Sequence, residues 1–177
     1  MTTKDAIRYA LGLAEGAFLP AVDAMADAPL TYPTSNGGCH PLWVMGHLAV
    51  VEGMLTAMLT QGDNPTQHWE PLFGQDSVAS ADASRYPAFE QVRATFLDLR
   101  RDNLKRLDAM TEVDLDRATP WQPRGLEEHF STVGRALLTV ALHQTMHRGQ
   151  VTDAVRASGR RVTRPAAAAP LRDAVGV

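Results

Sequence analysis

The chain has 177 residues, 45% of them apolar, and a formal net charge of −3 at neutral pH. A chain of this length and composition can bury a true core as one domain, and it is neither disordered nor a typical membrane protein. Acidic and basic residues are mixed along the sequence without a basic stripe, which argues against nucleic-acid binding.

The chain shows no sign of export or of disulfide chemistry. Its first eight residues carry charges where a signal peptide needs an apolar run, and no uncharged apolar segment reaches the roughly 18 residues of a membrane span. Cys39 is the only cysteine, which excludes an internal disulfide and a cysteine-rich zinc module. We therefore expect a soluble cytoplasmic protein.

The first half of the chain predicts two helices. Residues 3–26 have apolar side chains at spacings of three and four, which indicates an amphipathic helix. Residues 27–39 are rich in turn formers and predict a loop. A second helix is predicted from His40, with Pro41 at its first helical position, to about residue 61, where Gly62 and Pro65 end it.

Residues 62–87 form a long predicted connection, of the kind that serves as a lid, a binding loop or a crossover. A third helix is predicted over residues 88–110, and we assign it a buried side and a solvent side. The buried side is expected to hold Phe89, Val92, Phe96, Leu99 and Leu107, and the solvent side Arg93, Arg100, Arg101, Asp102 and Lys105.

After a second connection over residues 111–130, a fourth helix is predicted from Ser131 or Thr132 to Ser158, with Gly159 as its C-cap. No alternating pattern long enough for a sheet is present, so we expect an all-α fold, a four-helix bundle with a long crossover between helices two and three. Residues 1–159 are expected to form the domain, and residues 160–177 a tail that is loose or packed on the surface.

Three histidines lie on apolar helix faces. His143 and His147 are four residues apart on the apolar side of the last helix, and His47 lies on an apolar stripe of the second. An imidazole left unpaired there costs roughly 1–3 kcal/mol, so each ring needs a hydrogen-bond partner or a metal ion. Three imidazoles from two helices match an open catalytic metal site with water at the fourth position.

Three nearby polar residues are candidates for a supporting role. Glu52 and Arg148 follow the proposed ligands, and we interpret them as an ion pair between helices outside the ligand set, or as surface residues. Gln150 faces the same way as His147 and could bond a metal-bound water or a ligand ring.

The remaining candidates belong to loops. His40, His68 and His129 are expected to be exposed, although His40 could line the mouth of the site, and Cys39 is either a soft contact or a buried apolar filler. Trp69 and Trp121 are candidates for a substrate wall.

Gly46-His47-Leu48-Ala49, followed by His143-x-x-x-His147-Arg148-Gly149-Gln150, resembles the DinB-like superfamily over roughly residues 5–158. That superfamily holds damage-inducible proteins, thiol-dependent S-transferases and a mycothiol-dependent isomerase. The resemblance implies an up-down-down-up four-helix bundle, a divalent metal ion, usually zinc or nickel, on His47, His143 and His147, and frequent homodimers. It transfers no protein nucleophile or general base.

Three functions remain open. The first is a metal-dependent enzyme: a transferase that ionises a low-molecular-weight thiol for attack on a small electrophile, or a metal-hydroxide hydrolase of a small amide or ester. No carboxylate base is evident beside the histidines, which slightly favours thiolate chemistry. The second is a non-enzymatic, metal-stabilised stress or interaction protein. The third is a dimeric scaffold with a buried histidine network and no metal.

Overall fold

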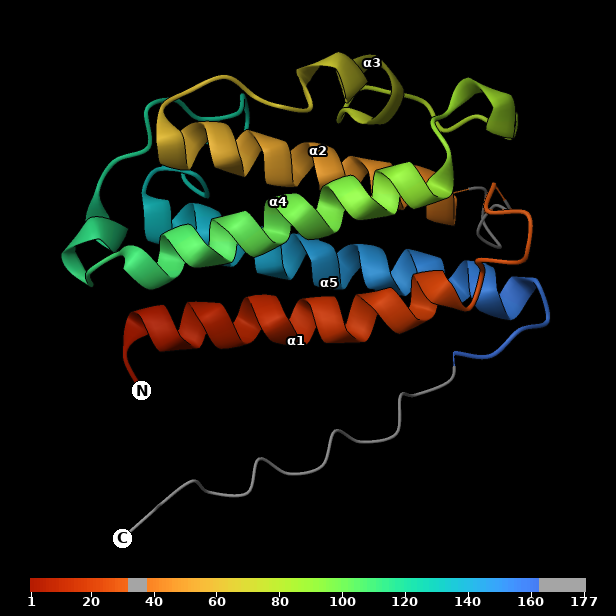
Figure 1. Ribbon diagram of the computed structural model, residues 1–177, viewed down its shortest axis with the longest axis horizontal. Helices are drawn as coiled ribbons and strands as arrows, with labels where there is room; N and C mark the ends of the chain where they lie inside the picture. Colours follow the sequence, from red (N-terminus) through yellow and green to blue (C-terminus); the bar gives the residue numbers. More distant parts are fainter. Residues whose placement is uncertain (32–37, 163–177) are drawn as a thin grey trace, which may run out of the picture.

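The computed structural model describes residues 1–31 and 38–162, and four long helices dominate it (Figure 1). They are α1 (Thr3–Asp23), α2 (Pro41–Thr60), α4 (Phe89–Ala109) and α5 (Val133–Ala157). Shorter helical turns lie between them: η1 (Gln67–Trp69), α3 (Glu70–Phe73), η2 (Ala83–Arg85) and η3 (Val113–Asp116). The described residues contain no strand, only an isolated bridge between Ala118 and Thr132, so the all-α prediction is confirmed.

Local sequence chemistry sets where the long helices begin and end. Thr2 and Asp5 form a reciprocal capping box at the start of α1, and the Thr132 side chain accepts the Arg135 N–H at the start of α5. At α2, the His40 ring is the N-cap and Pro41 follows at the first position. Beyond the end of α5, Gly159 adopts a φ of +76°, which a residue with a Cβ rarely tolerates.

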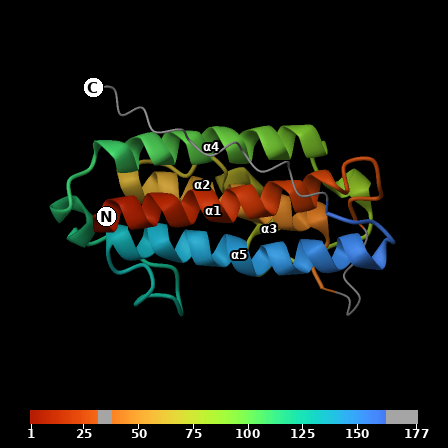
Figure 2. The same ribbon diagram turned by 90° about the horizontal axis from the view of Figure 1, so that it is seen from below.

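The long helices lie side by side in pairs, α1 beside α5 and α2 beside α4 (Figures 1 and 2). In Figure 1 the sequence colours advance from left to right along α1 and α5 and from right to left along α2 and α4. The chain between α2 and α4 therefore has to return the length of the bundle. It does so over α2, and α3 on this return segment packs against α2.

Helix α2 is the most buried element. By length and composition it is apolar enough to cross a membrane, yet 94% of its most apolar window is buried inside the bundle. A helix that is hydrophobic on every side is expected at the centre of a packed domain. The side chains of α2 accordingly join both halves of the core, with Trp43 and Met45 at one end and Leu55 and Met58 at the other.

The predicted solvent side of the third helix is wrong at one residue. Arg100 on α4 is 2% exposed, whereas Leu99, predicted to be buried, is half-buried. The Arg100 guanidinium donates to the Glu52 carboxylate on α2, to Gln144 Oε1 on α5 and to the Leu11 carbonyl on α1. A buried charge is tolerated where partners replace water, and these partners come from three other helices.

The last described residues are attached to the bundle. The Arg160 side chain donates to the Ala24 carbonyl and pairs with Asp27, and Val162 packs against the core. Most of the tail predicted over residues 160–177 lies outside the described residues, as does part of the loop predicted over residues 27–39.

Candidate metal centre

Three imidazoles converge between α2 and α5. The candidate ligand atoms of His47, His143 and His147 all lie within 4.8 Å of one another. His143 Nε2 is 3.3 Å from His47 Nε2 and 2.9 Å from His147 Nε2. Nitrogens bound about 2.0–2.1 Å from one ion are separated by about 2.9–3.4 Å in octahedral or tetrahedral geometry. The two spacings from His143 Nε2 therefore suit a single ion.

The opposite ring nitrogens orient two of these histidines. His47 Nδ1 lies 2.7 Å from the Phe73 carbonyl oxygen, and His147 Nδ1 lies 2.7 Å from Gln150 Oε1. Both partners are acceptors, so each Nδ1 donates and the lone pair falls on Nε2. Trp43 stacks on the His47 ring at 4.7 Å between centroids and 9° between planes, which limits rotation of that ring.

The three rings have too few protons to satisfy all their close nitrogen contacts, as expected where the nitrogens bind a cation. His143 Nε2 faces two nitrogens that carry lone pairs and has at most one proton to give. Protein hydrogen bonds alone leave one of these close contacts unsatisfied, whereas a divalent ion accepts all three lone pairs. The donor set therefore fits a divalent metal.

Burial keeps the rings in the form that binds metal. Loss of water, and to a smaller extent the neighbouring imidazoles, lower the pKa of His47 to about 4 and that of His143 to about 3. Burial also lowers the pKa of His147, whereas the hydrogen bond that its ring donates to Gln150 raises it. At neutral pH the three rings are uncharged, which is the state that ligates a metal.

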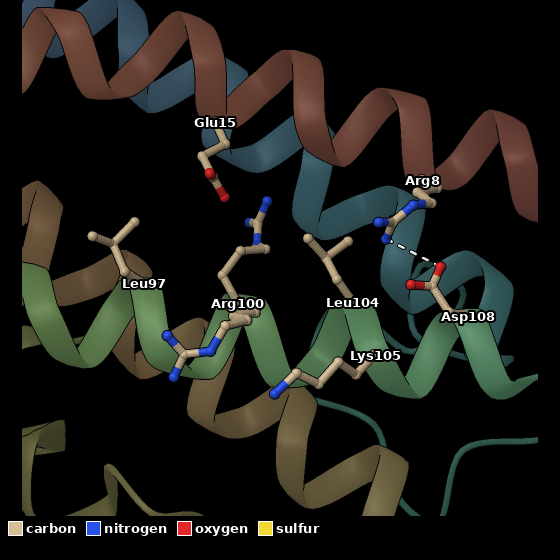
Figure 3. Close-up of a pocket in the computed structure, with 8 residues that line it drawn as sticks. Arg8, Glu15, Leu97, Arg100, Leu104, Lys105 and Asp108 are labelled. Carbon is tan, nitrogen blue, oxygen red and sulfur yellow. Dashed lines mark ion pairs between the residues drawn. The ribbon is translucent and has the colours of Figure 1, made fainter. Parts of the chain in front are cut away.

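A cavity of about 850 Å³ reaches two of the three histidines, His47 and His143. Its walls come from α2, α5 and the two long connections. The lining residues are His47, Val50, Val51, Met54, Asn64, Gln67, Glu70, Gln75, Trp121, Pro123, Leu126, His129, Phe130, Thr139, Val140, Leu142, His143 and Met146. A smaller hollow of about 300 Å³ lies between α1 and α4 beside the Arg8–Asp108 ion pair (Figure 3) and includes none of the histidines.

The two tryptophans proposed as a substrate wall have different positions. Trp121 lines the large cavity and is 42% exposed. Trp69 is 5% exposed and packs edge-on against Phe73, outside the cavity lining. Trp69 therefore supports the short helix α3 rather than a ligand.

The three polar candidates near the histidines also differ in what they contact. Gln150 bonds the His147 ring. The predicted ion pair between Glu52 and Arg148 is wrong, because Glu52 pairs with Arg100 at 2.7 Å in the core. Arg148 is exposed and donates from Nε to the Ala17 carbonyl, so it joins α5 to α1 without reaching Glu52.

The loop histidines and Cys39 do not add ligands to the cluster. His40, expected to be exposed, is 3% exposed, because its ring accepts the Trp43 N–H and its Nε2 bonds the Ser80 carbonyl. His68 is exposed, and His129 is exposed on the cavity wall. Cys39 packs against the core, and burial raises the pKa of its thiol, as expected for an apolar filler.

Two parts of the site were not found by sequence reasoning. The Phe73 carbonyl that orients His47 is a backbone atom, so no residue type announces it. Glu70 lines the cavity from α3, within a connection whose path the sequence pattern does not fix. The short apolar turn around Trp69 and Phe73 was the available signal that this segment returns to the bundle.

The fold and the site define a helical bundle whose facing helices carry a histidine cluster that could bind a metal ion. The DinB superfamily matches residues 10–151, and the chain belongs to that superfamily. This match confirms the family resemblance drawn from the histidine motifs. None of the curated proteins searched matches the chain.

Proposed function

We propose that the protein is a divalent-metal-dependent enzyme that transfers a small thiol to an electrophilic substrate. The observation that carries this proposal is the convergence of three neutral imidazoles, two of which, His47 and His143, line a cavity of about 850 Å³. A purely structural ion needs no such access, so the cavity supports an enzyme over a metal-stabilised interaction protein.

His47, His143 and His147 would hold the ion through Nε2, and zinc or nickel is the proposed metal. Three protein ligands leave a position open to a small molecule. The bound ion would lower the pKa of a thiol or a water molecule that it coordinates. Phe73 and Gln150 would keep the rings of His47 and His147 in the ligating orientation.

The cavity wall supports a nucleophile that comes from a co-substrate. The described lining residues include no Cys, Ser or Lys. The Thr139 hydroxyl donates to the His129 carbonyl. The apolar walls would hold the electrophile and exclude water from it. These features favour a low-molecular-weight thiol as the attacking group.

One observation keeps the hydrolase as an alternative. Glu70 lies on the same cavity as His47 and His143, where the sequence had shown no carboxylate. A carboxylate at such a place can act as a general base toward water. The alternative substrate is a small amide or ester.

The decisive experiment combines metal analysis with turnover. Untagged protein, purified without chelators, is expected to contain about one divalent ion per chain and to conjugate mycothiol, bacillithiol or glutathione to small electrophiles. His143→Ala is expected to lose both the metal and the activity. His129→Ala, on the same cavity but outside the ligand set, is the matched control and is expected to keep the metal. Ester hydrolysis without turnover of any thiol would make the hydrolase the preferred function and reject the thiol transferase.

We further propose the homodimer that the family resemblance implies and a cytoplasmic location, with small molecules rather than nucleic acid or membrane as partners. Tyr9 and Leu13 on α1 are 66% and 59% exposed and lie one turn apart, which supports α1 as a contact surface. Light scattering compares the mass of Leu13→Glu with that of the unmodified protein, and the variant is expected to be monomeric. An unchanged dimer mass would show that the interface lies on another surface.

A further inference from the structure

The large cavity has a polar side and a mainly apolar side, and different segments of the chain supply them. The connection after α2 supplies only polar side chains to the wall: Asn64, Gln67, Glu70 and Gln75. The connection before α5 and the outer turns of α5 supply mainly apolar ones. Trp121, Leu142 and Met146, which line the cavity, are 42%, 59% and 73% exposed. Large apolar side chains exposed around a cavity indicate a ligand that covers them.

Glu70 is the only carboxylate among the described residues that line the cavity. The described lining residues include no Lys or Arg. The Glu70 carboxylate makes no hydrogen bond or ion pair to another described residue, and its Oε2 lies over Gly74, at the place a Cβ there would occupy. Partial burial raises the pKa of Glu70 because the carboxylate loses water without gaining a partner.

A half-buried carboxylate without a protein partner is costly, and a cation from a ligand removes that cost. Apart from the proposed ion at the histidines and the exposed His129, the described wall offers no group that neutralises an anionic ligand. Discrimination therefore follows from charge: a positive group beside Glu70 gains an ion pair, whereas a negative one is repelled.

We propose that Glu70 determines the specificity of the cavity, which takes molecules with an apolar body and one cationic nitrogen, the nitrogen facing Glu70 and the body facing Trp121, Leu142 and Met146. This inference rests on the proposed function in taking the cavity as the substrate site. It assigns that substrate to the class of amphipathic amines, whichever of the two reactions the site performs.

Two probes of one shape test the proposal: 4-phenylbutylamine and 4-phenylbutanol. Their affinities for zinc-loaded protein are measured by calorimetry at pH 7. The amine is expected to bind about tenfold more tightly than the alcohol, which corresponds to about 1.4 kcal/mol. Glu70→Gln is expected to abolish this advantage and to leave the affinity for the alcohol unchanged.

Two further variants separate Glu70 from general charge effects. Asp76→Asn removes one negative charge from an exposed position outside the cavity lining and is expected to leave the amine preference intact. Gln75→Glu adds a carboxylate to the polar wall and is expected to increase the preference. The proposal is overturned if the unmodified protein binds amine and alcohol equally, or if the preference survives Glu70→Gln in a protein with an unchanged far-UV spectrum.

The result can be told apart from a failure of the proposed function. An amine preference in the unmodified, zinc-loaded protein, without turnover of any substrate by that protein, would support the ligand class and reject the enzyme. Turnover of uncharged electrophiles without any charge preference would support the enzyme and reject the role of Glu70.

Discussion

At the scale of single residues, the candidate metal centre depends on which nitrogen of each ring carries the proton. The Phe73 carbonyl and the Gln150 amide oxygen each accept a hydrogen bond from the Nδ1–H of one histidine. This leaves both Nε2 lone pairs facing His143. Hydrogen bonds to the outer nitrogen of a ligating histidine typically change metal affinity by 10- to 100-fold.

Gln150→Leu removes the acceptor for His147 Nδ1 and keeps a side chain of similar size. We expect zinc affinity to fall by about tenfold, because the ring loses its preferred tautomer and orientation. Competition with a chromophoric chelator measures the affinity. Arg148→Leu changes an exposed neighbour on the same turn, and a similar loss there would show that Gln150 has no special role.

The lowered histidine pKa values predict how the stability of metal-free protein depends on pH. His47 titrates near pH 4 when folded and near 6.5 when unfolded, so the unfolded chain binds more protons between these values. His143, with a folded pKa of about 3, acts in the same direction. We expect the free energy of unfolding to be constant above pH 6.5 and to decrease as pH falls toward 4.

Urea unfolding of chelator-treated protein between pH 7.5 and 4.5 measures this trend. His143→Gln removes one titrating ring and is expected to flatten the pH dependence, while His68→Gln, an exposed site, is expected to leave it unchanged. A stability that increases on acidification would mean that the rings gain protons on folding, contrary to their burial.

At the scale of elements, the short helix α3 orients one ligand of the candidate metal centre from outside the four long helices. Its last residue, Phe73, is 0% exposed and supplies the carbonyl that binds His47. It can approach α2 because residue 46 is a glycine. A Cβ at Gly46 would lie 2.3 Å from the Phe73 ring, which is far inside van der Waals contact.

Gly46→Ala should therefore push α3 away from α2 and lengthen the bond between Phe73 and His47. We expect a loss of about 1–3 kcal/mol in stability from overpacking, together with weaker metal binding. Gly12→Ala is the control, because Gly12 is on the exposed side of α1 and a Cβ there meets nothing within 4 Å. This substitution should stabilise the protein by about 0.4–1 kcal/mol. Equal effects of the two substitutions would contradict the packing argument.

At the scale of the whole molecule, one buried polar network joins all four long helices. Arg100 and Asn103 on α4 both bond the Glu52 carboxylate on α2, and Arg100 also reaches Gln144 on α5 and the Leu11 carbonyl on α1. Gln144 adjoins His143 in sequence, and Glu52 lies on the same helix as His47. The network therefore sets the relative positions of the two helices that carry the ligands.

Arg100→Met leaves the Glu52 carboxylate buried without its cation. We expect a loss of about 3–5 kcal/mol in unfolding free energy, since breaking a buried pair on one side leaves an uncompensated charge. Removing both charges, as in Glu52→Leu with Arg100→Met, should recover much of this loss. Guanidinium titration measures both, and a double variant as unstable as the sum of its single changes would contradict coupling through this pair.

The sequence by itself determined the helices and the identity of the three histidines. Apolar spacing, Pro41 and Gly159 define helix positions locally, and a four-residue spacing places His143 and His147 on one face whatever surrounds them. An apolar stripe on the second predicted helix added His47, and the family motif agreed with it. These features depend on neighbours within one or two helical turns, which a sequence displays directly.

Only the tertiary structure decided the burial of Arg100, the pairing of Glu52, the Phe73 carbonyl and the presence of Glu70 in the cavity. Each depends on a group far away in the chain: three helices supply the partners of Arg100, and a returning connection brings α3 to His47. Periodicity assigns a charged residue to solvent because water is its default partner. It has no means of registering that Glu52, 48 positions earlier, replaces that water.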